Sequence, residues 1–346
     1  MPHFVPGLEL ARAFYDEALA PLLGGTEHAA ALLGWGSDVL GFDTERSTDH
    51  GWGPRVQLFV ERHSVTAVEE AVEAGLPDAF RGWPTRFGWD AVPAAHHIDV
   101  EPLGEWLTGR LGFDPLGGVS VKQWLSTPQQ RLLEVTAGAV FHDPRGELAD
   151  VRDALAWYSD DVWLWLLACQ WRRLDQEEPF VGRAAEVGDE LGSRVVASRL
   201  VRDAMRLAFL LERRYAPYSK WLGSAFAQLD AAAALSPALL EVLSAQRYEE
   251  REDALVRVVE ELAERHNAAG VTQPVDATVR LFHERPFRVL GSARFVDACL
   301  ERVTDPWLKS LPLVGGIDQF VDSVDVLSDS SGFVAAAALY ERRPSP

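Results

Sequence analysis

The sequence predicts an α+β protein, with a domain of mixed helices and strands over residues 1–148 and a mostly α-helical domain over residues 149–346. The chain has 346 residues, which is enough for about two domains of roughly 150 residues each. Strand-like alternation is largely confined to the part before Asp150, and beyond it the apolar residues recur with the period of a helix. Hydrophobic residues make up 47% of the chain, so it can bury a full core.

The N-terminal part reads as alternating helices and strands. Apolar residues at helical spacing predict a helix over Leu8 to Leu23, which Gly24 and Gly25 end. A segment rich in Gly, Asp, Ser and Thr follows, so residues 34–54 are expected to form a loop with short strands. Further strands are predicted over residues 55–61, 96–100 and 132–142, and further helices over residues 65–74 and 103–111.

The C-terminal part reads as a helical bundle. Helices are predicted over residues 151–171, 183–214, 220–234, 237–245 and 248–268. Residues 272–290 contain prolines and are expected to connect elements. The last part, residues 294–327, is expected to hold one or two helices around the turn at Gly315 and Gly316.

Charge and cysteine content exclude several classes of protein. A net charge of -19 disfavours broad binding to the nucleic-acid backbone. The two cysteines, Cys169 and Cys299, make neither a disulfide framework nor a zinc site and are expected to be buried thiols. The apolar run from Val162 to Cys169 is shorter than the roughly 20 residues of a membrane helix, and no signal peptide is evident. We therefore expect a cytoplasmic protein that does not bind membranes.

The loop over residues 34–54 has the residues that phosphate and metal binding require. Gly36 allows the backbone to approach a phosphate closely, and the Ser37 hydroxyl donates a hydrogen bond. Carboxylates must then hold Mg²⁺ or Mn²⁺, and Asp49 and Asp99 follow in that order. A carboxylate on a neighbouring strand can also accept the proton of an acceptor hydroxyl.

The loop resembles the polymerase-β-like nucleotidyltransferase superfamily, whose motif is Gly-Ser, a gap of about ten residues, and two aspartates separated by one residue. Four segments together look like the DUF4037 group, a bacterial family of predicted nucleotidyltransferases: GSDVLGFDTERSTDHGWGPRVQLF, QQRLLEVTAGAVFHD, EEPFVGR and YAPYSKW. The resemblance implies a small mixed sheet with helices, followed by an α-helical domain like that of antibiotic nucleotidyltransferases.

One position departs from the superfamily's motif. With Asp49 as the first aspartate of the pair, the second falls at Gly51. Asp49 alone would bind Mg²⁺ weakly, because Mg²⁺ usually needs more than one carboxylate in near-ideal geometry. Asp38 or Asp43 is a possible substitute, depending on the path of the loop.

Other candidates carry alternative interpretations. Asp99, on the face of its strand opposite to Ile98 and Val100, is either the third carboxylate or a solvent-facing residue, and Glu134 in the next strand is a rival for that role. The candidates for nucleotide binding are Gly36, Ser37, Asp38, Arg55, Arg183 and Lys220. Lys220, one of three lysines, either reaches a triphosphate or lies at a helix junction packed by aromatic residues. Most tryptophans are expected in the core; Trp35 and Trp52, in the loop, are candidates to line a base or acceptor pocket.

Two functions follow from these features. The first is a Mg²⁺-dependent nucleotidyltransferase that moves NMP from an NTP, with ATP preferred, to a hydroxyl or amine of a small molecule or protein. In it Asp49 and Asp99 hold the metal, and Asp99 or Glu134 acts as base. The second is a nucleotide-binding or sensor protein in which Gly51 has removed the transfer chemistry.

Overall fold

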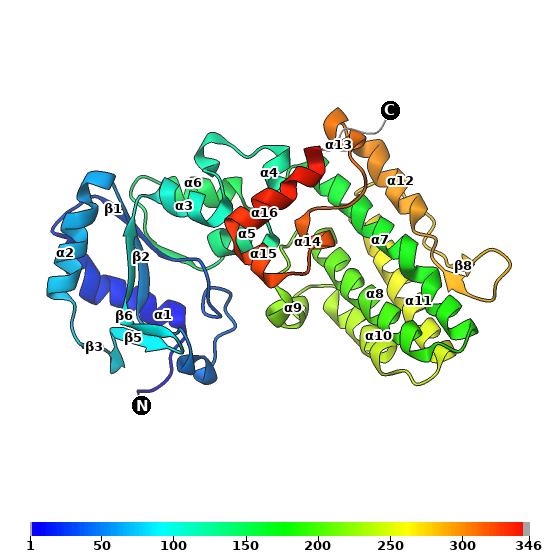
Figure 1. Cartoon of the computed structure of the whole chain (residues 1–346), viewed down its shortest axis with the longest axis horizontal. Helices are drawn as coiled ribbons and strands as arrows, with labels where there is room; N and C mark the ends of the chain where they lie inside the picture. The colour runs from blue at the N-terminus through cyan, green and yellow to red at the C-terminus, as the bar shows by residue number, and fades with distance from the viewer. Residues whose placement is uncertain (1, 342–346) are drawn as a thin grey trace. The chain divides into compact units, whose positions relative to one another are not determined.

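The computed structural model describes residues 2–341 and confirms an α+β protein with a small mixed sheet and many helices (Figure 1). The chain divides into two compact units. Among the described residues, the first comprises 2–123, 130–156 and 328–334, and the second comprises 124–129, 157–327 and 335–341. The units exchange short segments, so the boundary expected between residues 148 and 149 stays a prediction of where two domains divide.

The first unit is built on a five-stranded sheet in the order β5-β6-β2-β1-β7. Its strands are β1 (His28–Leu32), β2 (Arg55–Val60), β5 (Arg86–Trp89), β6 (Val92–Glu101) and β7 (Ala139–His142). Only β2 and β6 run parallel; the other neighbours are antiparallel. Two short strands, β3 (Ala79–Phe80) and β4 (Trp83–Pro84), form a separate ribbon.

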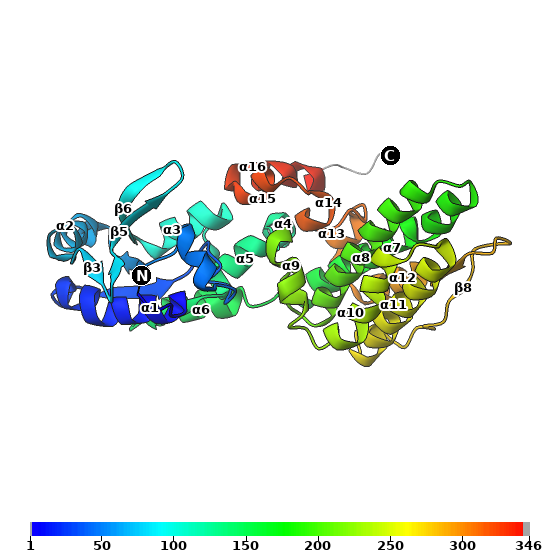
Figure 2. The same ribbon diagram turned by 90° about the horizontal axis from the view of Figure 1, so that it is seen from below.

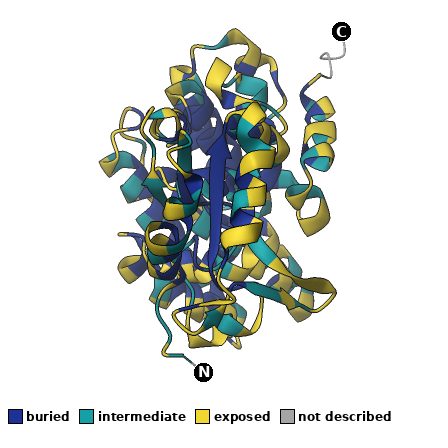
Figure 3. Cartoon of the chain, turned by 90° about the vertical axis from the view of Figure 1, so that its left-hand side faces the viewer, coloured by how far each residue is buried: buried dark blue, intermediate teal, exposed yellow. Residues whose placement is uncertain are grey.

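One face of the sheet packs on the core of this unit. The predicted N-terminal helix is present as α1 (Gly7–Phe14) and continues through a π turn and a 3-10 turn to Leu23, where Gly24 takes a φ of 58°. Helix α2 (Val65–Gly75) joins it. Their apolar residues pack against alternate residues of β2 and β6, which leaves the other face of these strands for polar side chains. Every residue of β2 is buried, and buried residues run through the centre of the view in Figure 3.

The strand predicted over residues 132–142 is wrong for its first half. Residues 129–136 form helix α5 (Gln129–Thr136), and only residues 139–142 form a strand, β7. Gly138 separates them with a φ of 68°, and a Cβ at this position would lie 2.1 Å from the carbonyl oxygen of Leu32. The chain changes from helix to strand at this close approach to β1.

The second unit is helical, and its long helices lie side by side (Figures 1 and 2). They are α7 (Asp160–Glu186), α8 (Glu190–Leu211), α10 (Ala232–Ser244), α11 (Tyr248–Ala268) and α12 (Ala293–Arg302). Helix α11 has the predicted bounds. The helix predicted over residues 151–171 is instead divided between α6 (Glu147–Ala154) and α7. Helix α7 continues to Glu186 and ends before Gly188, whose φ is 78°.

The remaining elements are short. They are α3 (Leu103–Leu111), α4 (Val121–Ser126), α6 (Glu147–Ala154), α9 (Ser219–Phe226), α13 (Pro306–Ser310), α14 (Ile317–Phe320), α15 (Val324–Ser328) and α16 (Ser330–Ala336), with the hairpin strands β8 (Arg280–Leu281) and β9 (Arg288–Val289). The hairpin lies in the predicted connector. The last part of the chain thus holds more, and shorter, helices than expected.

Two further expectations can be compared with the structure. Cys169 and Cys299 are buried free thiols, and burial raises the pKa of both. Among the helices of residues 2–341, none combines the length and apolar character needed to cross a bilayer.

Candidate functional site

The candidate loop joins β1 to β2 at one end of the sheet. Its first turn has unpaired hydrogen-bond donors: within residues 2–341, the backbone N–H groups of Gly36 and Ser37 and the Ser37 hydroxyl donate to no other group. Both residues are half-buried. Gly36 has a φ of 133°. Adjacent open N–H groups in a turn can form a concavity suited to an anion, and the predicted phosphate binding at Gly36 and Ser37 stays a prediction.

Asp38 and Arg55 form a buried ion pair under this turn. One guanidinium nitrogen of Arg55 lies 2.7 Å from both carboxylate oxygens of Asp38, and the two side chains are 4% and 2% exposed. A Cβ at Gly36 would lie 2.1 Å from Oδ1 of Asp38, so a larger residue would displace the pair. Asp38 therefore balances Arg55 and fixes the floor of the turn.

Asp43, the other possible substitute for the missing carboxylate, is also engaged. One of its oxygens accepts hydrogen bonds from the Gly7 backbone N–H at 2.7 Å and from Nε1 of Trp52 at 2.9 Å. Trp52 itself is buried in the core, with 5% of its surface exposed. Asp43 thus joins the start of α1 to the loop.

Gly51, which occupies the place of the second aspartate, is enclosed by aromatic rings. Its φ is 63°, a backbone conformation that residues other than glycine rarely adopt. A Cβ there would lie 3.0 and 3.3 Å from two ring carbons of Trp35 and 3.5 Å from Trp89. The two indole rings lie 5.5 Å apart. A carboxylate at this position would need both a strained backbone and displacement of Trp35.

Asp49 and Asp99 are both exposed. Asp49 ends a 3-10 turn, and its carboxylate has no ion-pair partner within residues 2–341. Asp99 is paired in register with Gln57 of β2, whose amide nitrogen donates to it at 3.3 Å. The Gln57 carbonyl in turn accepts from the Leu33 backbone N–H at 2.8 Å. Asp99 lies on the face of β6 opposite to the buried Ile98, as the alternation predicted.

Asp99 also affects its neighbour on that face. Burial and the charge of Asp99 raise the pKa of Glu101, and Arg110 and Arg62 partly offset this. The polar face of β6 therefore carries two carboxylates in succession.

Glu134 lies on helix α5, where no strand places it beside Asp99. It is buried, and its carboxylate accepts from Arg131 at 2.6 Å and lies 3.5 Å from Arg110. The placement of Glu134 on a third strand was wrong. Its contact with Arg110 joins α5 to α3, and its contact with Arg131 lies within α5.

These side chains do not fit a two-metal centre. Mg²⁺ prefers several oxygen ligands in near-ideal geometry. Among the described residues, no group of three or more His, Cys, Asp or Glu side chains could hold a metal ion. Asp38 is paired with Arg55, and Asp43 accepts hydrogen bonds from Gly7 and Trp52. Gly51, where the motif would have its second carboxylate, is enclosed by the rings of Trp35 and Trp89.

Arg183 and Lys220 belong to the helical unit and are exposed. Arg183 lies in the last turn of α7, with its guanidinium 5.7 Å from the ring centre of Phe180. Lys220 lies in the first turn of α9, with Nζ 4.9 Å from the ring centre of Trp221. Their predicted contact with a nucleotide stays a prediction.

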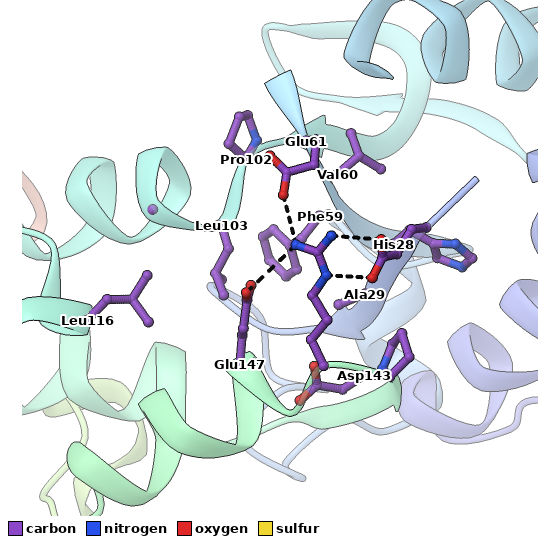
Figure 4. Close-up of a pocket in the computed structure, with 14 residues that line it drawn as sticks. His28, Ala29, Phe59, Val60, Glu61, Pro102, Leu103, Leu116, Asp143 and Glu147 are labelled. Carbon is purple, nitrogen blue, oxygen red and sulfur yellow. Dashed lines mark hydrogen bonds and ion pairs between the residues drawn. The ribbon is translucent and has the colours of Figure 1, made fainter. Parts of the chain in front are cut away.

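A separate cavity of about 190 Å³ lies at the opposite end of the sheet, where β1 begins and β2 ends (Figure 4). Arg145 lies against it and pairs with Glu27 at 2.5 Å, Glu61 at 2.8 Å and Glu147 at 3.9 Å. The pairing with Arg145 lowers the pKa of Glu27. Three carboxylates pair with one guanidinium and Asp143 also lines the pocket, so a triphosphate would be repelled here.

Two contributors to the loop site were not singled out as such in the sequence. Gln57 connects Asp99 to the backbone after β1, and its signal was a polar residue within an otherwise apolar run. Trp89 encloses Gly51 from the β5–β6 hairpin, and no local pattern pointed to it.

The fold and the loop define an α+β chain with a glycine-rich turn, whose N–H groups have no partner within residues 2–341, beside a mixed sheet. Residues 124–222 match the family model described as "Domain of unknown function (DUF4037)", which confirms the expected resemblance over that segment. The match contains three of the four segments that suggested the family, and it lies C-terminal to Gly36, Asp49 and Asp99.

Similarity to other proteins is distant. The chain is similar to the crystal structure of a nucleotidyltransferase-like protein from Exiguobacterium sibiricum 255-15, with 13% sequence identity and a TM-score of 0.32. The alignment covers 80% of this chain and 83% of that one. No curated protein matches the sequence.

Proposed function

We propose that the first unit binds a nucleoside triphosphate, with ATP as the first candidate, and that it does so without a two-metal centre. The observation that carries this proposal is the contrast within one loop. Gly36 and Ser37 offer unpaired N–H donors, while Gly51 is packed against Trp35 and Trp89 where a metal ligand would be needed. A triphosphate is the ligand that the family resemblance favours for such a turn.

In this proposal the chain's own residues bind and orient the ligand. The N–H groups of Gly36 and Ser37 donate to phosphate oxygens. Arg55 adds little net charge, because Asp38 neutralises it within the buried pair. Binding thus depends on directed hydrogen bonds more than on charge, which suits a chain with a net charge of -19.

The second candidate is Mg²⁺-dependent transfer of NMP to a hydroxyl or amine acceptor on a small molecule or a protein. The observation that favours it is that Asp49 and Asp99 are both exposed, and that Asp49 has no ion-pair partner in the part of the chain that the structure describes. The missing ligand at Gly51 weighs against it.

The test measures ATP binding by calorimetry in EDTA and in Mg²⁺, together with transfer of label from α-³²P-ATP to protein or to small-molecule acceptors. The first proposal expects similar Kd values in both buffers and no label transfer. Binding that requires Mg²⁺, with label on an acceptor, would support the transferase instead. Asp49→Asn separates the two further, because only the transferase should lose activity.

A further inference from the structure

The ring of Trp35 directly precedes the phosphate turn and is unusually open. Of the twelve tryptophans in the sequence, only Trp35 and Trp307 are exposed, and Trp35 is 40% accessible. Large aromatic side chains are normally buried because they remove much apolar surface from water. An exposed indole beside an anion-binding turn therefore needs an explanation.

The indole is held in place. The guanidinium carbon of Arg55 lies 4.2 Å from the centre of the ring, and Arg55 also donates to the Trp35 carbonyl at 3.3 Å. Arg55 cannot move freely, because it is paired with the buried Asp38. One face of the ring thus rests on a fixed cation, which is a favourable arrangement for an aromatic ring.

The far edge of the ring is fixed as well. Two of its carbons lie closest to Gly51, and Trp89 packs against it at an interplanar angle of 52°. Trp89 is supported by His97 at 5.0 Å and His50 at 5.9 Å between ring centres. Arg55, Gly51 and Trp89 thus hold the indole, while Trp35 as a whole stays 40% exposed and can be reached by a ligand.

We propose that Trp35 is a stacking platform for the base of the nucleotide whose phosphates bind Gly36 and Ser37. This rests on the proposed nucleotide-binding function and deepens it by assigning the base-recognition surface. A planar heteroaromatic ring is the ligand that fits, because every base has a π face and stacking on tryptophan needs no particular hydrogen-bond pattern. The ring that fills the place of the metal ligand thus serves base binding.

The platform also predicts weak discrimination among bases. Stacking is tolerant of base identity, whereas hydrogen bonds to the base edge are selective. His50 is exposed beside the cluster and lies 3.3 Å from the still more exposed Asp90, so these two polar side chains are open to water. Purine nucleotides should bind more tightly than pyrimidine nucleotides mainly because their rings are larger.

The test compares ATP with inorganic tripolyphosphate, both in EDTA, by calorimetry on the full chain. Wild type should bind ATP about five- to 150-fold more tightly than tripolyphosphate, the range expected for stacking of one base. Trp35→Ala should weaken ATP binding to the level of tripolyphosphate binding. The Kd for tripolyphosphate should stay within about twofold of the wild-type value. Trp35→Phe should retain part of the difference in affinity between the two ligands. Trp307→Ala, at the other exposed tryptophan, should change the affinity for neither ligand.

Each other outcome overturns the inference in a recognisable way. If Trp35→Ala lowered the affinity for ATP and for tripolyphosphate by the same factor, the ring would only position the loop. Equal affinity of wild type for ATP and tripolyphosphate would remove the base platform and leave the phosphate turn standing. Failure of wild type to bind either ligand would remove the proposed function, and this inference with it.

Discussion

The two halves of the loop between β1 and β2 differ in what they leave open. The half around Gly36 and Ser37 has unpaired donors over a buried ion pair. The half around Gly51 has no second aspartate, and the rings of Trp35 and Trp89 pack where its side chain would lie. Donors bind anions and carboxylates bind cations, so under the proposed function the first half binds phosphate and the second half does not bind a metal. The proposal therefore requires that phosphate binding and metal binding can separate within one motif.

The largest expected effect comes from breaking the ion pair beneath the phosphate turn. Asp38→Ala leaves the Arg55 guanidinium buried without a counter-charge, which should lower the free energy of unfolding by about 3–5 kcal/mol. Urea unfolding monitored by tryptophan fluorescence measures this. A loss below about 1 kcal/mol would mean that the pair is open to water, and the floor of the turn would not be fixed as described.

A smaller loss is expected at Glu134, and it tests the helix placement. Glu134→Gln removes a charge that Arg131 and Arg110 contact, so unfolding should become easier by about 1–3 kcal/mol. ATP binding should be unchanged. If wild type transferred label from α-³²P-ATP and Glu134→Gln abolished this transfer without loss of stability, Glu134 would act as the base.

Gly51→Asp tests whether the lost carboxylate can simply be replaced. The positive φ and the contact with Trp35 should destabilise the variant by about 1–2 kcal/mol. Mg²⁺-dependent label transfer from α-³²P-ATP should not appear. Gly41→Asp is a matched control, because its φ of 71° is similar and a Cβ there meets no atom within 4 Å. Gain of transfer in Gly51→Asp would show that the site lacks only this one ligand.

The smallest effect on stability is expected at Asp49. Its carboxylate is exposed and forms no ion pair within residues 2–341, so Asp49→Ala should change the free energy of unfolding by less than about 0.5 kcal/mol. ATP binding in EDTA should also be unchanged. A large destabilisation would instead identify Asp49 as a structural cap of its turn, and complete loss of a measured transfer activity would identify it as a metal ligand.

The sequence predicted elements well where one period dominated. Residues 55–61, 65–74, 103–111 and 248–268 became elements within one residue of these bounds, because their alternation or helical spacing was unambiguous. Residues 132–136 were wrongly read as strand, because a short apolar run fits both periods and the contact between Gly138 and Leu32 that ends the helix is tertiary.

The candidate site was predictable in its residues and not in its pairings. The open turn at Gly36 and Ser37 follows from a local pattern. The engagement of Asp38 by Arg55, and the packing of Trp89 on Gly51, join residues that are distant in sequence. No local pattern shows which carboxylates of a loop are already paired, so the sequence could name Asp38 as a candidate but not exclude it from metal binding.

The most direct test of this account is a crystal structure of the chain with a non-hydrolysable ATP analogue and Mg²⁺. The account predicts phosphate oxygens on the N–H groups of Gly36 and Ser37, the base stacked on the ring of Trp35, and no protein carboxylate bound to the metal. Mg²⁺ held by both Asp49 and Asp99, at the ligand distance of about 2.1 Å, would contradict it.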